Sequence, residues 1–157
     1  MVAGFDLLPF IAVSSGLTFA GPIRVFFGFM RKEIFMPHEH AAMSAQMQEC
    51  IENCTNCHRN CLETITHCLG MGGAHAAPDH IRLMQDCVQI CQTSADFMIR
   101  GSQFHARTCG VCAEICEACA DDCERLAKQD NDAHMQACAD MCRKCAATCR
   151  EMSKMAA

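Results

Sequence analysis

The chain of 157 residues contains no tryptophan, no tyrosine and only nine phenylalanines. Seven of these phenylalanines precede residue 36, so only Phe97 and Phe104 serve the remainder of the chain. Aliphatic side chains are also sparse beyond that point. Aromatic and aliphatic side chains supply most of the apolar area that folding removes from water. A core built from carbon alone would therefore be thin, and another kind of side chain has to fill it.

The chain also lacks two features that would place it in large functional classes. Its formal net charge of −5 and its isoelectric point near 5.9 leave no basic surface for nucleic acid. Its apolar run Leu7–Met30 is interrupted by two prolines, three glycines and Arg24. A membrane-spanning helix needs about 20 consecutive, mostly apolar residues, so we expect neither a nucleic-acid partner nor a membrane span.

Residues 1–42 contain no cysteine and differ in composition from the rest of the chain. As a secretory leader this segment lacks a basic start and carries Asp6 instead, although Thr18–Ala20 is a weak candidate for a cleavage site. We therefore expect a poorly ordered extension or a weak leader over residues 1–42, and a single domain over residues 43–157.

Cysteine, in contrast, is abundant, with 16 residues, and its spacing is regular. Within Cys109–Cys123 the five cysteines are separated by steps of three and four residues. On an α-helix this spacing places them within an arc of roughly 80°. The same steps recur in three further groups, and we call each group a cysteine ladder. The four ladders are Cys50, Cys54, Cys57, Cys61 and Cys68; Cys87 and Cys91; Cys109, Cys112, Cys116, Cys119 and Cys123; and Cys138, Cys142, Cys145 and Cys149.

The ladder spacing argues against a disulfide framework. Cysteines one helical turn apart point the same way from one helix, and the directed Cβ geometry of a disulfide is hard to meet there. Disulfides between helices stay open, but so many thiols exceed what a small bundle needs. We expect reduced thiols and hence a cytoplasmic location. Export is the alternative if residues 1–42 act as a leader.

The regular pattern after residue 42 predicts four helices. Ser44 is a suitable N-cap for the first, which we expect to run to about Leu69 before Gly70, Gly72 and Gly73. We expect the others from Pro78 or Asp79 to Arg100, from Ser102 to Lys128, and from a cap at Asp130 or Asn131 to about Met155. Four helices with short connections indicate an all-α, antiparallel up-down-up-down four-helix bundle with a cysteine-lined core.

A column of thiols inside such a bundle favours monovalent copper over other metals. The familiar CxxC knuckles of zinc sites lie in turns, whereas here each CxxC pair lies inside an expected helix. Ferredoxin motifs use steps of three, three and four ending in Cys-Pro, which this sequence lacks. Cysteine and methionine select Cu(I), which accepts two or three sulfurs, and bridging sulfurs can link successive ions.

The net charge of the metal-filled core also favours Cu(I). If each thiolate bridges two Cu(I) ions and each ion takes two thiolates, every lost proton is replaced by one positive charge. Four thiolates around one Zn²⁺ leave a net charge of −2, and burying such a charge costs several kcal/mol per ion. Free cysteine can also act as a small apolar filler. That explanation suits one or two core cysteines better than sixteen on core-facing lines.

Methionines and histidines at the two ends of the expected bundle are weaker candidates for metal ligands than the cysteines. One end gathers Met43, Met47, Met98, His105 and Met152, and the other gathers His75, His80, Met84, His134 and Met135. Methionine at helical spacing usually belongs to a core. We add His105 to the sixteen cysteines as a metal ligand because it lies four residues before Cys109 on the same ladder. His58 and His67 fall off the ladders, and we expect them at the surface.

These motifs resemble those of the bacterial copper storage proteins, which are cysteine-lined four-helix bundles. The resemblance covers about Met43–Met155 and rests on CIENCTNCHRNC, CVQIC, CGVCAEICEACADDC and CRKCAATC. It implies that the cysteines bind many Cu(I) ions inside a preformed bundle, with His and Met near its opening. The chain looks like the cytosolic branch of the family, which implies a homotetramer. It departs from the family in its N-terminal extension.

We therefore expect a non-enzymatic protein that stores or sequesters multiple Cu(I) ions per chain. Copper would enter at an end lined by Met and His and pass between cysteine sites. Two alternatives stay open: a thiol-rich protein that responds to zinc or to oxidation, and a protein that delivers copper to a cuproenzyme. The expected partners are copper ions, other copies of the chain, and a copper chaperone or a cuproenzyme as recipient.

Overall fold

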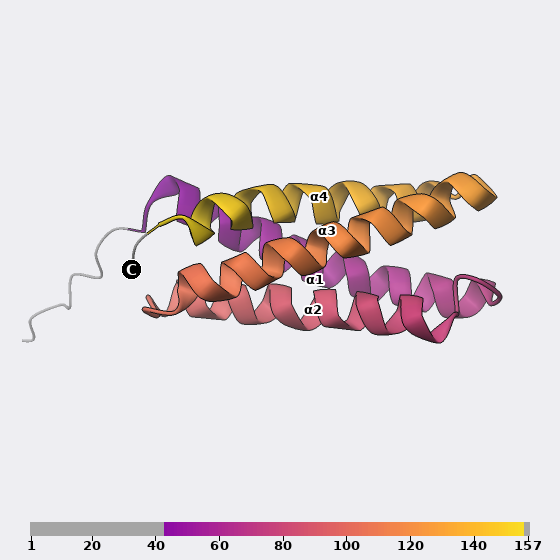
Figure 1. Ribbon diagram of the computed structural model, residues 1–157, viewed down its shortest axis with the longest axis horizontal. Helices are drawn as coiled ribbons and strands as arrows, with labels where there is room; N and C mark the ends of the chain where they lie inside the picture. Colours follow the sequence, from indigo (N-terminus) through magenta and orange to yellow (C-terminus); the bar gives the residue numbers. More distant parts are fainter. Residues whose placement is uncertain (1–42, 156–157) are drawn as a thin grey trace, which may run out of the picture. The chain divides into compact units, whose positions relative to one another are not determined.

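The structure is a computed structural model that describes residues 43–155, so the expectations for residues 1–42 lie outside the described residues. Its four helices are α1 (Ala45–Met71), α2 (Pro78–Ile99), α3 (His105–Asp130) and α4 (Ala133–Ser153). Helix α1 packs on α2 and α4, and α3 packs on the same two helices. Successive helices run in opposite directions (Figure 1). The predicted up-down-up-down bundle is confirmed, and residues 43–155 contain no strand.

Helix α1 begins and ends where its capping residues allow. The backbone N–H of Met47 donates to Oγ of Ser44 over 3.2 Å, which confirms the predicted N-cap. At the other end Gly70 stays helical, so α1 extends to Met71, slightly beyond the predicted end. Gly72 then takes a positive φ of 73°, a conformation that glycine adopts without strain, and ends the helix.

The connection between α3 and α4 differs from the prediction by one or two residues. Asp130 or Asn131 was expected to cap α4, but Asn131 ends α3 with a left-handed φ of 53°. Asp132 is the N-cap instead, because its Oδ1 accepts hydrogen bonds from the backbone N–H groups of His134 (2.8 Å) and Met135 (3.3 Å). The tight turn leaves the second oxygen of Asp132 free for another contact.

Helix α3 starts three residues later than the sequence suggested, at His105 rather than Ser102. The residues between form a turn in which the backbone carbonyl of Ser102 accepts from the N–H of His105 over 3.0 Å. Oγ of Ser102 accepts from the N–H of Phe104 over 3.2 Å. Ser102 therefore belongs to the connection, and it places His105 at the first turn of α3.

The core between the four helices is made of sulfur and small side chains. All 16 cysteines are fully buried, as the ladder pattern predicted. The largest other side chains that are fully buried are Met84, Met98, Leu126, Met135 and Met152. Buried alanines, among them Ala113, Ala120, Ala139 and Ala146, lie beside the cysteines of α3 and α4. Alanine adds little bulk, so these helices can approach each other closely.

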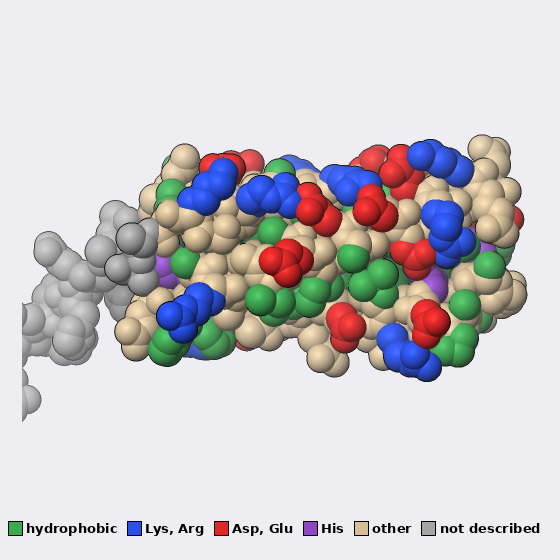
Figure 2. Space-filling view, viewed as in Figure 1, with side chains coloured by type: hydrophobic (Ala, Val, Ile, Leu, Met, Phe, Trp, Pro, Cys, Tyr) green, Lys and Arg blue, Asp and Glu red, His purple; other side chains and the backbone are tan. Residues whose placement is uncertain are grey.

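The outer surface is charged and mixed in sign. On the face shown in Figure 2, acidic and basic side chains are interspersed along the helices. Arg143 on α4 pairs with Asp121 and Glu124 on α3, and Lys128 pairs with Glu124 at 2.9 Å. Exposed pairs of this kind contribute about 0–1 kcal/mol each. Within residues 43–155, no helix combines the length and apolarity that crossing a membrane requires.

Candidate metal centre

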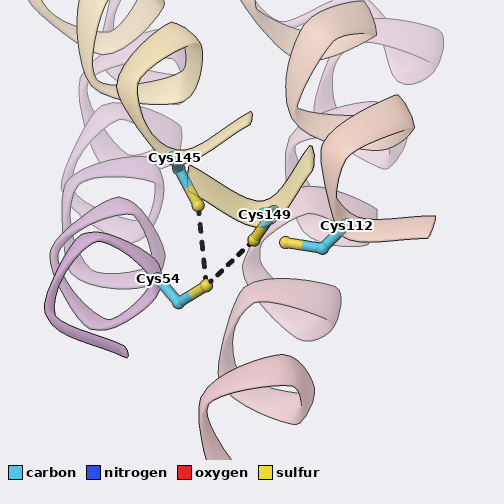
Figure 3. A group of neighbouring side chains, drawn as sticks. All are labelled: Cys54, Cys112, Cys145 and Cys149. Carbon is cyan, nitrogen blue, oxygen red and sulfur yellow. Dashed lines mark hydrogen bonds between the residues drawn. The ribbon is translucent and has the colours of Figure 1, made fainter. Parts of the chain in front are cut away.

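The ladders of the four helices meet along the bundle axis and bring sulfurs from distant parts of the chain together. Sγ of Cys54 on α1 lies 3.4 Å from Sγ of Cys149 and 3.7 Å from Sγ of Cys145, both on α4 (Figure 3). Cys112 on α3 points toward the same centre. The four sulfurs lie within 4.8 Å of one another and are buried. Three helices therefore contribute to one group that could hold a metal ion.

Further groups of the same kind follow along the axis. They are Cys57, Cys91, Cys116 and Cys145; Cys57, Cys61, Cys87 and Cys142; and Cys50, Cys109 and Cys149. Cys57, Cys145 and Cys149 each belong to two groups, so the groups are joined by shared sulfurs. The series continues through Cys61 and Cys138, whose sulfurs are 3.9 Å apart. Most of the thiols form one connected column rather than separate sites.

The spacing of the sulfurs suits a closed-shell metal ion. A thiolate bond of about 2.3 Å to such an ion places two ligands about 3.8 Å apart in tetrahedral geometry and about 4.0 Å apart in trigonal geometry. Several neighbouring sulfurs lie at about this separation or slightly closer, for example Cys57 and Cys142 at 3.7 Å and Cys54 and Cys149 at 3.4 Å. Binding by three or four thiolates therefore needs only small side-chain movements, whereas binding by two requires their sulfurs to separate to about 4.6 Å.

Crowding makes the thiols ionise unequally. A thiolate that accepts S–H donors is stabilised, and its donors are held in the protonated form. A hydrogen bond from Cys116 is the main cause that lowers the pKa of Cys57 to about 7, and one from Cys123 does the same for Cys119. Burial, in contrast, raises the pKa of Cys68 to about 11. Some thiols of the column are thus poised to lose a proton near neutral pH.

Two hydroxyl groups occupy ladder positions where a thiol could stand. Ser94 follows Cys91 by three residues on α2, and its fully buried Oγ has no hydrogen-bond partner. Cys91 contacts Cys112, and three residues before Cys112 lies Cys109, so the antiparallel register places Ser94 near the level of Cys109. Thr64 on α1 is also fully buried, and its Oγ1 donates to a backbone carbonyl of its own helix over 2.9 Å.

His105 lies at the end of the α3 ladder with one ring nitrogen unused. Its Nδ1 lies 2.8 Å from the backbone carbonyl of Ser102, and because a carbonyl only accepts, Nδ1 carries the proton. Its Nε2 is buried and has no hydrogen-bond partner. An imidazole whose Nε2 is buried and unpaired can offer that nitrogen to a metal ion. That His105 is a metal ligand stays a prediction, and Nε2 is the atom it would use.

At the opposite end of the bundle, three donors that the selected site residues did not include surround Cys68. Nε2 of His80 lies 3.4 Å from its sulfur, Sδ of Met135 lies 3.5 Å away, and Nδ1 of His75 lies 4.0 Å away. The sequence indicated that His75, His80 and Met135 share this end, but not that they converge on one thiol. Cys68 lies outside the groups of cysteines described above and forms a mixed cluster instead.

Carboxylates hold the two histidines of this cluster in place. Nδ1 of His80 lies 2.7 Å from Asp122, and Nε2 of His75 lies 2.9 Å from Asp130. Burial of Asp122 opposes its ionisation, but the His80 ring and the Arg125 guanidinium together hold the pKa of its carboxyl below the usual range. A carboxylate that accepts from one ring nitrogen turns the other toward a metal. This is the arrangement of His80 with respect to Cys68.

The expectation that His58 and His67 lie at the surface is wrong, because both are half-buried between helices. Nδ1 of His58 on α1 is 3.0 Å from the carbonyl of Val88 on α2. Nε2 of His67 on α1 is 2.7 Å from Oδ2 of Asp132, the N-cap of α4. A position beside the ladder on a packed helix faces a neighbouring helix rather than water, which the period of one helix does not reveal.

Comparison with known proteins identifies relatives of this cysteine-lined bundle. A family model described as copper storage protein matches residues 43–154. A crystal structure from Nitrosospira multiformis is 48% identical with a TM-score of 0.63, and the match covers 69% of this chain and 94% of that one. No match was found among curated proteins.

Two similar structures carry copper. The Cu(I)-bound copper storage protein Csp3 of Bacillus subtilis is 36% identical with a TM-score of 0.62, and the match covers 69% of this chain and 98% of that one. A cytosolic copper storage protein of Streptomyces lividans, with five coppers, is 28% identical with a TM-score of 0.60; here the shares are 71% and 95%.

Proposed function

Since the chain belongs to the copper storage protein family, we propose that its 16 core cysteines are the ligands that hold the Cu(I) this protein stores. Storage of multiple Cu(I) ions is what the family and the copper-bound relatives have in common. The observation that carries the ligand assignment is the column of buried sulfurs in which neighbouring groups share Cys57, Cys145 and Cys149. Shared sulfurs allow bridging, and bridging allows roughly one Cu(I) per thiolate.

The charge of the filled core favours Cu(I) over zinc. Within residues 43–155 no Lys or Arg is buried, and apart from His75, His80 and His105 at its ends the column is surrounded by apolar or uncharged side chains. The core therefore supplies no fixed positive charge to offset an excess of thiolates. One Cu(I) per thiolate leaves the column neutral, whereas four-thiolate Zn²⁺ sites leave buried negative charge. Zinc binding on a large scale is for this reason the weaker alternative.

Both ends of the column offer ligands of a different kind, and we assign them different tasks. His105, with its free Nε2, captures ions at the end that also contains Met47, Met98 and Met152. Cys68, with its two histidines and Met135, terminates the column at the other end. A thioether and an imidazole bind Cu(I) without losing a proton at neutral pH, so they suit transfer better than retention.

Several features of this storage protein are proposed from the family resemblance rather than from its own geometry. We assign it no catalytic activity, a cytoplasmic location like that of the Streptomyces protein, and a homotetrameric assembly. Residues 1–42 form an extension outside the copper-binding domain 43–157, so their removal leaves copper capacity unchanged. A copper chaperone or a cuproenzyme is the partner from which copper arrives or to which it goes.

The decisive experiment is anaerobic titration of the reduced protein with Cu(I) in the presence of a competing chelator. We expect capacity close to the number of cysteines, 16 per chain, with Zn²⁺ unable to displace the bound copper. The thiol content of the freshly purified, denatured protein is the matched control. A capacity of only a few ions with all thiols free would overturn storage in the column, and mostly oxidised thiols would favour the redox alternative.

A further inference from the structure

A cluster of nitrogen and oxygen donors lies beside the thiol column and shares only His75 with the Cys68 cluster that terminates it. His67 near the end of α1, His75 in the following loop and Asp132 at the start of α4 each offer one donor atom. These three atoms lie within 4.8 Å of one another. The closest pair is Nε2 of His67 and Oδ2 of Asp132, at 2.7 Å.

Asp132 is held in position by capping α4, which uses only one of its two side-chain oxygens. Its Oδ1 accepts the hydrogen bonds that cap α4, from the N–H groups of His134 and Met135. Its Oδ2 is thereby aimed at His67. The contact with the His67 ring, with those capping bonds, holds the pKa of the Asp132 carboxyl below its usual range. The carboxylate is therefore ionised and available as a metal ligand at neutral pH.

The two imidazole rings are restrained as well. The His67 ring stacks on the His134 ring with centroids 4.4 Å apart and planes inclined by 13°. It meets the His75 ring edge-on at a centroid distance of 6.2 Å. His75 is only 3% exposed, and its Nε2 is 2.9 Å from Asp130. Three rings and two carboxylates thus converge where α1, α3 and α4 end or begin.

We propose that His67, His75 and Asp132 form a site for one divalent ion of the zinc type, distinct from the Cu(I) column. Imidazole and carboxylate suit Zn²⁺, whereas Cu(I) prefers sulfur. Bonds of about 2.0–2.2 Å to nitrogen and oxygen require donors roughly 3.3 Å apart, so small ring movements close the cluster around the ion. One carboxylate leaves a single positive charge, and the adjacent Asp130 neutralises it.

The site gives this end of the bundle a structural link of its own. An ion bound there joins α1, the loop that follows it and the start of α4. That loop also carries His75 toward Cys68, so the ion fixes one donor of the Cys68 cluster. The proposal does not depend on copper storage, because none of its three ligands is a thiol.

The test uses the full chain with its thiols filled anaerobically with Cu(I), and Co²⁺ as the spectroscopic probe. We expect one Co²⁺ per chain with the visible bands of a tetrahedral nitrogen and oxygen site, without a sulfur charge-transfer band, and displacement by Zn²⁺. H67A should weaken Co²⁺ binding at least about tenfold. D132N should do the same while retaining the helix cap, because asparagine is an equally good N-cap.

The matched control is H58A, which removes a half-buried histidine from the same helix without touching the cluster. It should bind Co²⁺ like the parent, and all variants should keep the parent's helicity and Cu(I) capacity. Absence of Co²⁺ binding in the parent overturns the site. So does a sulfur charge-transfer band that disappears in C68A, because it would place the ion at the thiol. Equal losses in H58A and H67A would also contradict the assignment.

Discussion

The sulfurs of Cys54 and Cys149 lie 3.4 Å apart although 95 residues separate them in the chain. This contact joins the first helix to the last inside a core that cysteine, methionine, leucine and alanine side chains fill. We expect such a core to fold without metal. In small zinc domains, by contrast, metal binding and folding are one event.

The first prediction concerns the fold of the metal-free protein. The reduced protein, freed of metal by a chelator, should show the circular dichroism of a largely helical protein, because methionine, leucine and buried cysteine already fill the core. Copper should raise its melting temperature without adding much helix. A coil spectrum that becomes helical only on addition of metal would contradict a preformed column.

The second prediction concerns the ladder of α3. Replacement of Cys109, Cys112, Cys116, Cys119 and Cys123 by alanine should remove about a third of the Cu(I) capacity, since it removes 5 of 16 thiols. Neighbouring sites also lose bridging sulfurs. Anaerobic titration measures the loss, and circular dichroism checks that the variant is still helical. If a folded variant loads as much copper as the parent, these cysteines are filler.

The third prediction uses the buried hydroxyl of Ser94. Because Ser94 stands at a ladder position near Cys109, S94C should add a thiolate to the column and raise capacity by about one ion. S94A should leave capacity unchanged, since a lone hydroxyl is a poor ligand for Cu(I). Titration of the two variants side by side checks both. An S94C thiol that stays free in the copper-saturated protein would show that the register assigned here is wrong.

The fourth prediction separates capture from retention. H105A combined with replacement of Met47 by leucine should leave capacity nearly intact but slow the transfer of Cu(I) from a chelator by about tenfold or more. Leucine keeps the apolar volume at position 47, so the fold is unaffected. Stopped-flow transfer kinetics provide the measurement. H80A is the counterpart at the far end, and equal slowing by both would remove the preference for the His105 end.

The fifth prediction concerns pH. With pKa values of about 7, Cys57 and Cys119 should contribute thiolate absorbance in the reduced, metal-free protein between about pH 6 and 8. These values lie below the usual 9.0, so the ionisations stabilise the fold fully above pH 9, and that contribution is lost as the pH falls to about 7.

Ultraviolet titration of the parent against C57S and C119S tests this assignment, because each variant should lose the ionisation of the cysteine that it replaces. Thiolate absorbance that first appears above pH 8.5 in all three proteins would disprove it.

The helices and the cysteine column could be predicted from the sequence because both depend on local periodicity. Steps of three and four residues specify which face of a helix is buried, and Ser44 and Gly72 are helix boundaries that a short motif reveals. The position of His105 at the end of the α3 ladder could be predicted in the same way, whereas its role as a ligand stays a prediction. The N-cap of α4 was less certain because Asp130, Asn131 and Asp132 are all good capping residues.

The surroundings of Cys68 and His67 could not be predicted, because they depend on how helices and loops meet. The loop after α1 returns His75 toward the bundle through two glycines with positive φ, Gly72 and Gly73. The turn before α4 directs Oδ2 of Asp132 toward His67 only because Asn131, rather than Asp130, is left-handed. Helical periodicity carries no information about the placement of His75 or of the Asp132 oxygen, since each depends on the backbone conformation of one or two residues in a turn.

The thiol groups of the column draw their members from different helices, and this has a consequence for the lifetime of the protein. Each bound ion is a cross-link between segments distant in the chain, and a ligand that binds only the folded state suppresses opening of that state. Proteolysis commonly follows the population of opened molecules. A filled bundle is therefore the long-lived form and an empty one the form degraded first, so that the cellular amount of this protein tracks the copper it carries.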